Sequence, residues 1–225
     1  MLWLLELSDP LQTEEICRLL PALTEPRQRR VKAMKNPQLQ TQVILAELLL
    51  RYALKEEHNL STLPPIERTK QGKPFFPSLS DLHFNLSHCK TAVACVLDTA
   101  PAGVDVQEYR QLCRPSGTLY RNVLTKSERS WVEAGETFEE QIRRFTALWT
   151  CKEAYGKALG VGLCYDLNTT QLLPQGFPWV YGGFTLEARQ TDSYAAALCA
   201  KTPLPWRQLT IAELLYPENG GNNHV

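Results

Sequence analysis

The sequence lacks the marks of several classes of protein. Its longest apolar runs are cut by Glu47 and Arg51, far short of the roughly 20 residues that a membrane-spanning helix needs, so we expect no membrane segment. The start of the chain has no basic region and carries Glu6 within its apolar run, which favours a first strand over a signal peptide. Lysines and arginines number 24, as do the acids. We therefore expect no general affinity for nucleic acid or an anionic membrane, and a polyanion must be held by a local cluster.

Cysteine pairs and the common nucleotide motifs are also missing. The seven cysteines include no C-x-x-C pair, which disfavours a disulfide framework and a zinc site and favours free thiols in a reducing cytoplasm. No G-x-S-x-G elbow is present, which argues against a serine hydrolase. Gly160 and Gly162 follow a helix, whereas P-loop and dinucleotide-binding motifs precede one. Any nucleotide must therefore be held in another way.

Hydrophobic periodicity and cap residues predict an α+β fold. We expect a strand over 2–7, helices over 9–21, 26–35 and 37–57, and strands over 82–86, 91–98 and 103–107. Capping boxes at Thr125 and Thr137 open two further helices, and strands near 178–187, 193–200 and 209–215 finish the fold. A break at 99–102 divides residues 1–100 from residues 101–216, and the polar tail 217–225 is expected to be disordered.

The most informative stretch is the predicted helix from Trp149 to Gly160. At about 100° per residue, Lys152, Glu153 and Lys157 lie on one face and the apolar residues on the other. Glu153 and Lys157 are four residues apart, so their side chains can converge on one small volume. The alternative is an ordinary exposed ion pair, which contributes only about 0.2–0.5 kcal/mol and has no other role.

A second carboxylate comes from the strand over 103–107. Val104 and Val106 alternate with Asp105 and Gln107, as in a half-buried strand, so the two polar side chains share a face. Tertiary folding is needed to bring Asp105 to Glu153. Two carboxylates with water are a ligand set that Mg²⁺ prefers.

Basic residues cluster between Arg27 and Lys35. Such a run is usually a solvated face, but Arg27 and Arg30 share a helical face with Val31 and Met34, the side expected to turn toward the protein. Guanidinium groups beside an apolar wall bind phosphate in a bidentate manner with little competing water. We therefore expect Arg27 and Arg30 to be the ligand contacts of this run.

Two further segments present polar groups on stiff supports. In Gly72-Lys73-Pro74, glycine permits close backbone approach and proline fixes φ. In Phe84-Asn85-Leu86-Ser87-His88, three polar side chains cluster where a strand ends. Each segment alone is common, and a lone histidine is more often structural than functional.

Taken together, four motifs resemble the 4′-phosphopantetheinyl transferases of the surfactin-synthetase-activating type. They are, in order, Gly72–Pro74, Phe84–His88, Gly103–Val106 and Trp149–Leu163, and the likeness runs from about Arg27 to the last strand. The resemblance implies two similar α+β halves related by a pseudo-twofold axis, with coenzyme A in the cleft between them. It implies transfer of 4′-phosphopantetheine from coenzyme A to a serine of an apo acyl or peptidyl carrier protein, which leaves adenosine 3′,5′-bisphosphate.

The resemblance also implies roles for individual residues. Asp105 and Glu153 are the implied ligands of Mg²⁺, with Mn²⁺ as a substitute, and Lys157 contacts the phosphates. The implied coenzyme A contacts are Arg27, Arg30, Lys73, Pro74, Ser87, His88 and Lys152. Gln107 stands where the surfactin type commonly has glutamate. An amide oxygen is a poorer Mg²⁺ ligand, so either Gln107 or water completes the metal site.

In the implied mechanism Glu153, directly or through a metal-bound water, takes the serine proton, and Lys157 protonates or shields the departing phosphate. The segment Leu119–Leu124, with Trp131 nearby, is expected to meet the acidic carrier or else to pack around the helix over 125–135. Two alternatives stay open: a non-catalytic coenzyme A or nucleotide-binding module, and a Mg²⁺-dependent phosphotransferase using ATP. Because both cleft-forming halves lie in one chain, we expect a monomer. Fatty-acid, polyketide and nonribosomal-peptide carriers are equally compatible with the sequence.

Overall fold

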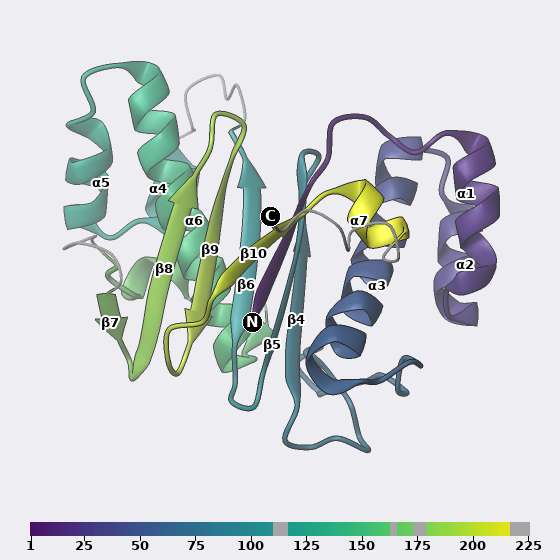
Figure 1. Cartoon of the computed structure of the whole chain (residues 1–225). Helices are drawn as coiled ribbons and strands as arrows, with labels where there is room; N and C mark the ends of the chain where they lie inside the picture. Colours follow the sequence, from purple (N-terminus) through teal and green to yellow (C-terminus); the bar gives the residue numbers. More distant parts are fainter. Residues whose placement is uncertain (110–116, 163–165, 173–178, 217–225) are drawn as a thin grey trace, which may run out of the picture.

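The computed structural model describes residues 1–109, 117–162, 166–172 and 179–216, and it shows a mixed α+β protein (Figure 1). The elements are, in chain order, β1 (Leu2–Glu6), α1 (Thr13–Leu19), η1 (Leu20–Ala22), α2 (Glu25–Ala33), α3 (Pro37–His58), β2 (Glu67–Arg68), β3 (Pro74–Phe75), β4 (His83–His88), β5 (Ala92–Asp98), β6 (Gly103–Glu108), α4 (Gly117–Val123), α5 (Lys126–Glu133), α6 (Phe138–Leu159), η3 (Leu167–Thr169), β7 (Trp179–Tyr181), β8 (Phe184–Gln190), β9 (Tyr194–Ala200), β10 (Trp206–Leu209) and α7 (Ile211–Leu215).

The first sheet has the strand order β10-β1-β5-β4. β1 pairs antiparallel with β5 and parallel with β10, so the end of the described chain returns to its beginning. Along β1 the side chains alternate between two cores, as the strand geometry requires. Trp3 and Leu5 pack with α3, whereas Leu2 and Leu4 face the second sheet.

The second sheet has the order β6-β9-β8-β7, with every pair antiparallel. The two sheets lie against each other in the middle of the molecule, and α3 and α6 cover their outer faces (Figure 1). Small side chains such as Ala94, Ala196 and Ala200 fill much of the core between the sheets. Because alanine side chains are short, the strands of the two sheets can approach closely there.

The two long helices have well-defined ends. At the start of α3 the Asn36 side chain accepts hydrogen bonds from the backbone N–H groups of Gln38 and Leu39, and at the start of α6 the Thr137 side chain accepts one from Glu140. These bonds satisfy N–H groups that have no partner within the helix. α6 ends at Gly160, whose φ of 74° is the left-handed conformation that glycine adopts without strain.

The edges of the two sheets meet where β4 lies beside β6. No strand pairs with β6 on this side within the described chain, and side chains of β4 take the place of a strand. Asn85 Oδ1 accepts a hydrogen bond of 2.9 Å from the Val104 N–H, and Ser87 Oγ accepts one of 3.3 Å from the Val106 N–H. These two bonds fix β6, which carries Asp105, onto the first sheet.

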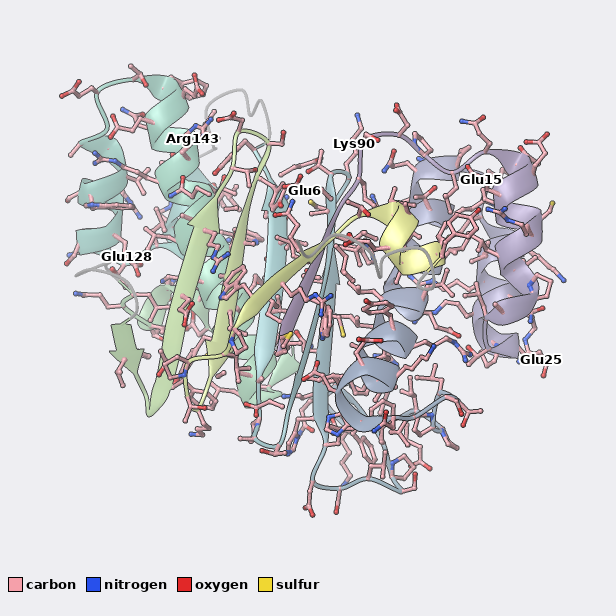
Figure 2. All side chains as sticks on the ribbon, viewed as in Figure 1. Glu6, Glu15, Glu25, Lys90, Glu128 and Arg143 are labelled. Atoms are coloured by element: carbon pink, nitrogen blue, oxygen red, sulfur yellow. The ribbon has the colours of Figure 1, made fainter. Side chains whose placement is uncertain are left out.

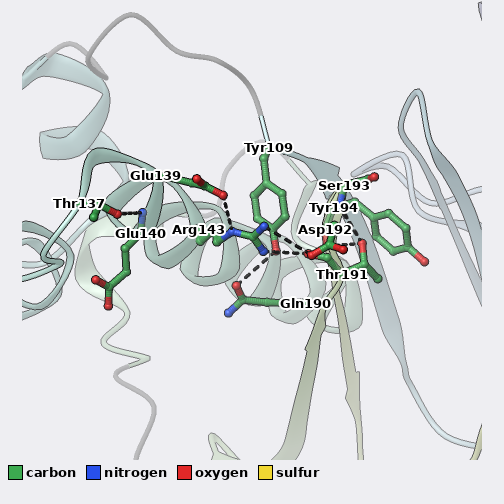
Figure 3. Close-up of polar contacts among 10 residues, drawn as sticks. All are labelled: Tyr109, Thr137, Glu139, Glu140, Arg143, Gln190, Thr191, Asp192, Ser193 and Tyr194. Atoms are coloured by element: carbon green, nitrogen blue, oxygen red, sulfur yellow. Dashed lines mark hydrogen bonds and ion pairs between the residues drawn. The ribbon is translucent and has the colours of Figure 1, made fainter.

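A polar cluster around Arg143 fixes α6 to the second sheet where β6 ends (Figure 3). The Arg143 guanidinium donates a hydrogen bond of 2.9 Å to the Thr191 carbonyl in the β8–β9 turn. It also lies over the Tyr109 ring, with 4.7 Å between the guanidinium carbon and the ring centroid. Tyr109 directly follows β6, so this cluster holds α6 and β6 in one orientation.

The order of elements expected from the sequence is confirmed over most of the described chain. The capping box at Thr125 is present, and the region near 178–187 contains the two strands β7 and β8. The strand expected over 209–215 is wrong, because β10 ends at Leu209 and Thr210 opens α7 through a capping box with Glu213. The expected tail over 217–225 lies outside the described residues. Of the helices described, none has the length and apolar character that crossing a membrane requires.

Candidate active site

The site is built where α6 crosses β6. Gly103 at the start of β6 touches α6 so closely that a Cβ added to it would lie 2.1 Å from the Ala154 carbonyl oxygen and 2.4 Å from the Ala158 nitrogen. Only glycine allows this approach. Two residues further along the strand, Asp105 lies on the same face and is 7% exposed. Close packing of the strand on the helix therefore brings Asp105 to the face of α6 that carries Glu153 and Lys157.

Lys157 contacts several other groups of the site. Its ammonium nitrogen lies 2.6 Å from Asp105 Oδ1 and donates hydrogen bonds of 3.1 Å to Ser87 Oγ and to the Val104 carbonyl. The Ser87 hydroxyl in turn donates a hydrogen bond of 2.7 Å to the same Oδ1 of Asp105. The lysine thus contacts β4 and β6 at once and brings Ser87 and Asp105 together with α6.

Glu153 lies one helical turn before Lys157. Its pKa is raised by desolvation and by the negative charge of Asp105, and Lys157 opposes the shift. Among the described residues no hydrogen bond is made by the Glu153 carboxylate or by Asp105 Oδ2. Two neighbouring carboxylates with free oxygens and mutual repulsion are a suitable ligand set for a divalent cation.

The protein offers few side chains as metal ligands at this site. No group of three or more histidine, cysteine, aspartate or glutamate side chains lies close enough to bind a metal within the described part of the chain. Gln107 is half-buried on the face of β6 that carries Asp105. Mg²⁺ is commonly held by one or two protein carboxylates with water and substrate phosphates, so the residues present fit a Mg²⁺ site that the substrate completes.

A pocket of about 360 Å³ opens beside these groups. One wall is the charged face of α6, with Glu153 and Lys157, and the facing wall is the loop over 71–74. Among the described residues the lining is Gln71, Gly72, Lys73, Pro74, Asn85, Glu153, Gly156, Lys157, Gly160, Gly162 and Leu167. The pocket therefore has a cationic and a carboxylate group on one wall and the loop over 71–74 on the other.

Lys73 and Pro74 line this pocket as expected, but the lysine ammonium is already engaged. It donates a hydrogen bond of 2.9 Å to the Ala158 carbonyl at the end of α6, with the Ala102 carbonyl at 3.5 Å. Desolvation lowers the pKa of Lys73. The side chain thus neutralises the carbonyl end of α6 and fixes the loop over 71–74 to it.

Cationic groups continue from Lys157 toward α2. The pKa of His88 is lowered by partial desolvation and then by the charges of Lys157, Arg30 and Arg27. The pKa of Arg27 is lowered by desolvation, against Glu47, and further by Arg30 and Arg68. These couplings indicate that the cations lie near one another, with Glu47 as the acid that partly offsets the charge of Arg27. The group formed by Arg27, Arg30, Arg68 and His88, here called the cationic cluster, is suited to an anion.

Lys152 lies elsewhere, contrary to the sequence expectation of a phosphate contact. Its side chain is 0% exposed and pairs at 2.8 Å with Glu128, which is also 0% exposed and is labelled beside α5 in Figure 2. The ammonium also donates to the Leu167 and Thr170 carbonyls, both at 2.6 Å. With three donors used inside the protein, Lys152 holds α5, α6 and η3 together and has no donor left for a ligand.

Sequence reasoning assigned no role to two residues of the site. Asn85 lines the pocket and anchors β6, and its position two residues before Ser87 on the same strand face is a signal that was available. Arg68 belongs to the cationic cluster by its effect on Arg27. Its short strand β2 carries no hydrophobic pattern, so no local signal indicated its position.

Comparisons with known proteins agree with this arrangement. Residues 101–199, which contain β6 and α6, match the model of the 4′-phosphopantetheinyl transferase superfamily. The chain is 27% identical over 161 residues to the 4′-phosphopantetheinyl transferase Sfp of Bacillus subtilis (strain 168), covering 71% of this chain and 70% of that protein. It is 31% identical over 160 residues to the 4′-phosphopantetheinyl transferase AcpT of Salmonella typhimurium, covering 69% of this chain and 77% of that protein.

Fold and pocket define a mixed α+β enzyme that handles a phosphate-bearing substrate, with two acids and a lysine at one end of the pocket and further cations nearby. The chain belongs to the 4′-phosphopantetheinyl transferase superfamily.

Proposed function

We propose that this protein transfers 4′-phosphopantetheine from coenzyme A to a serine of an apo carrier protein, in a reaction that requires Mg²⁺. The observation that carries the proposal is the meeting of Asp105, Glu153 and Lys157 beside one pocket. Phosphoryl transfer of this kind depends on alignment and on neutralising charge more than on covalent catalysis. These three residues supply the charges that such a reaction needs.

Asp105 and Glu153 are the proposed metal ligands, and Gln107 or water completes the set. When bound, Mg²⁺ supplies positive charge that offsets the charge of the diphosphate. The Ser87 hydroxyl and the Lys157 ammonium both hold Oδ1 of Asp105, which leaves Oδ2 free toward a cation. Mn²⁺ has similar oxygen preferences, so we expect it to substitute.

Coenzyme A is proposed to extend from the acids to the cationic cluster. Lys157 and Ser87, which contact each other, are proposed to bind the diphosphate, and Pro74 lies in the loop over 71–74 that lines the opposite wall. Arg27, Arg30 and His88 are proposed to bind the 3′-phosphate, because cations that repel one another bind a dianion strongly. The Lys73 ammonium supports this wall from behind through the Ala158 carbonyl.

Glu153 is the proposed general base. The carrier serine Oγ forms a bond to the β-phosphorus, its proton passes to the Glu153 carboxylate, and the bond from phosphorus to the oxygen of adenosine 3′,5′-bisphosphate breaks. A raised pKa makes Glu153 a stronger base than an ordinary glutamate. Lys157 stabilises the negative charge that develops on the departing phosphate.

The architecture around the site is part of the proposal. We take residues 1–100 and 101–216 as two α+β halves related by a pseudo-twofold axis, with the ligand in the cleft between them and a monomer as the working unit. β10 and α7 come from the second range but pack with the first sheet and α3, so they would hold the halves together. The free thiols described, Cys17, Cys89, Cys95, Cys151 and Cys199, suit the reducing cytoplasm.

The carrier is proposed to contact α4 near Leu119–Leu124. Val123 and Leu124 are buried with Trp131 packed beside them, while Arg121 and Asn122 are exposed. The exposed arginine would face an acidic partner. Packing alone accounts for the buried members of this segment.

The test is to incubate the protein with coenzyme A, Mg²⁺ and apo carriers of several pathways and to weigh each carrier by mass spectrometry. A gain of one phosphopantetheine is expected. An unchanged mass with every carrier, together with measurable coenzyme A binding, would identify a non-catalytic module instead. Competition between coenzyme A and ATP in a binding assay separates a third alternative, a kinase-like phosphotransferase.

A further inference from the structure

Glu47 in α3 is a buried carboxylate that joins α3 to α2. The residue is 2% exposed. Oε1 accepts hydrogen bonds of 2.7 Å from the Thr24 N–H and 2.9 Å from Arg51 Nη2. Oε2 accepts bonds of 2.9 Å from the Thr24 hydroxyl and 3.4 Å from Arg27 Nε. A carboxylate withdrawn from water is stable only when its oxygens are satisfied in this way.

This carboxylate fixes the position of α2. The helix buries only Val31, and one buried residue cannot determine how a helix is rotated about its axis. Thr24 stands at the N-cap of α2, yet its hydroxyl makes no bond to its own helix, because it donates to Glu47 instead. Both polar groups of Thr24 therefore attach the first turn of α2 to α3.

The same carboxylate orients Arg27. Only Nε of the guanidinium bonds to Glu47, and neither Nη group makes a hydrogen bond within the described residues. The Arg27 side chain is 24% exposed, and its positive charge lies close enough to Arg30, Arg68 and His88 to be coupled to theirs. Glu47 also pairs with Arg51, so one negative charge faces two guanidinium groups and the three side chains together carry a net positive charge.

We propose that Glu47 is a positioning residue for a phosphomonoester: it holds α2 and Arg27 so that the two free Nη groups meet the 3′-phosphate of coenzyme A. This inference rests on the proposed function and identifies how the nucleotide end of the substrate is selected. Since a guanidinium binds phosphate through two parallel N–H groups, its orientation matters as much as its charge.

The test compares adenosine 3′,5′-bisphosphate with adenosine 5′-monophosphate by calorimetry, because the two differ only in the 3′-phosphate. The wild-type protein is expected to bind the bisphosphate more tightly. In Glu47→Gln the dissociation constant of the bisphosphate should rise about tenfold, from the loss of one charge-assisted arrangement, with that of the monophosphate unchanged. In transfer assays KM for coenzyme A should rise with kcat unchanged.

Two further variants separate positioning from stability. Arg51→Gln removes another partner of the same carboxylate, so it should lower the melting temperature without changing the preference for the bisphosphate. Combining Arg27→Ala with Glu47→Gln should weaken bisphosphate binding no more than Arg27→Ala alone, because Glu47 acts through Arg27. A double variant much weaker than either single variant would contradict this route.

A folded Glu47→Gln that keeps the wild-type preference overturns the inference, as does a wild-type protein without that preference. Should Glu47→Gln fail to fold, Thr24→Val decides: it deletes one bond to Glu47 at constant shape, and the preference should fall about threefold. An unchanged preference in folded Thr24→Val overturns the inference. The proposed function is judged separately, since absence of carrier modification would refute it while the phosphate preference could still be present.

Discussion

The Lys157 ammonium lies 2.6 Å from Asp105 Oδ1, and this ion pair joins α6 to β6 at the edge that side chains of β4 cover in the described part of the chain. The side chains are 28% and 9% exposed respectively. An ion pair so little exposed leaves a costly unpaired charge when one partner is removed.

Replacing Lys157 should therefore affect both stability and activity. We expect Lys157→Met to lower the free energy of unfolding by about 1–3 kcal/mol, because Asp105 is left uncompensated, and to lower kcat by about 100-fold or more. Adding Asp105→Asn should recover stability but not activity. Thermal unfolding and carrier modification measure the two effects, with exposed Lys126→Met as the control. Full activity in Lys157→Met would contradict the assigned role.

Glu153→Gln should cut turnover by orders of magnitude and leave the fold intact, because an amide can neither take the serine proton nor neutralise a cation. The control is Glu133→Gln on α5, an exposed glutamate. Because desolvation and the charge of Asp105 raise the pKa of Glu153 in the metal-free protein, protons should compete with the metal, and the apparent affinity for Mg²⁺ should weaken as the pH falls through that pKa. The positive charge of Lys157 lowers that pKa. Because Lys157→Arg keeps this charge, it should leave the pH dependence nearly unchanged. Near-normal carrier modification by Glu153→Gln would refute the base.

Gly103 is predicted to tolerate no side chain. In Gly103→Ala the new Cβ meets the Ala154 carbonyl and the Ala158 nitrogen, so β6 must move away from α6 at a cost of about 3 kcal/mol. The shift also separates Asp105 from Glu153, so activity per folded molecule should fall. Gly183→Ala is the matched control, because its φ of 75° is strained at a cost of about 1 kcal/mol but its Cβ meets nothing closer than 3.8 Å. Equal activity of the two variants per folded molecule would argue against this geometry.

Lys152 is predicted to serve stability alone. In Lys152→Met the buried Glu128 keeps its charge without a cationic partner, which should cost about 3–5 kcal/mol. Combining Glu128→Gln with Lys152→Met should recover part of this loss, since glutamine still accepts a bond from the Leu172 N–H. The recovered double variant should bind coenzyme A with an unchanged KM. A KM raised tenfold would restore Lys152 as a ligand contact.

Local patterns predicted the central part of the site. The alternation of β6 placed Asp105 opposite the core, and the helical spacing of α6 placed Glu153 beside Lys157. Patterns of this kind cannot identify a partner far along the chain. Lys152 shares the charged spacing of Lys157 but meets Glu128 from α5, and nothing near Lys152 in the sequence distinguishes the two lysines.

The end of the fold was misread for a different reason. Thr210 and Glu213 form a capping box, a helix signal that outweighs the apolar residues taken for a strand over 209–215. The bonds from β4 side chains to β6 were not predictable, because register rules describe strands that pair through their backbones. Asn85 therefore looked like an ordinary polar residue at the end of a strand.

The pKa of His88 should change when a 3′-phosphate binds to the cationic cluster. Desolvation and the charges of Lys157, Arg30 and Arg27 lower this pKa below the usual 6.5, so the unfolded chain binds the proton more readily than the folded one. The stabilising effect is complete above about pH 6.5 and declines as the pH falls below that value. A bound 3′-phosphate opposes the cations, so it should raise the pKa.

Proton NMR titration measures this shift, with the His88 signal assigned by its absence in His88→Asn. In the free protein the midpoint should lie below 6.5, and adenosine 3′,5′-bisphosphate should move it upward by about one unit or less. Replacing both Arg27 and Arg30 by glutamine should raise the midpoint in the free protein and reduce the shift caused by the ligand. If the bisphosphate leaves the midpoint unchanged, the 3′-phosphate does not bind beside His88, and the cationic cluster has another ligand.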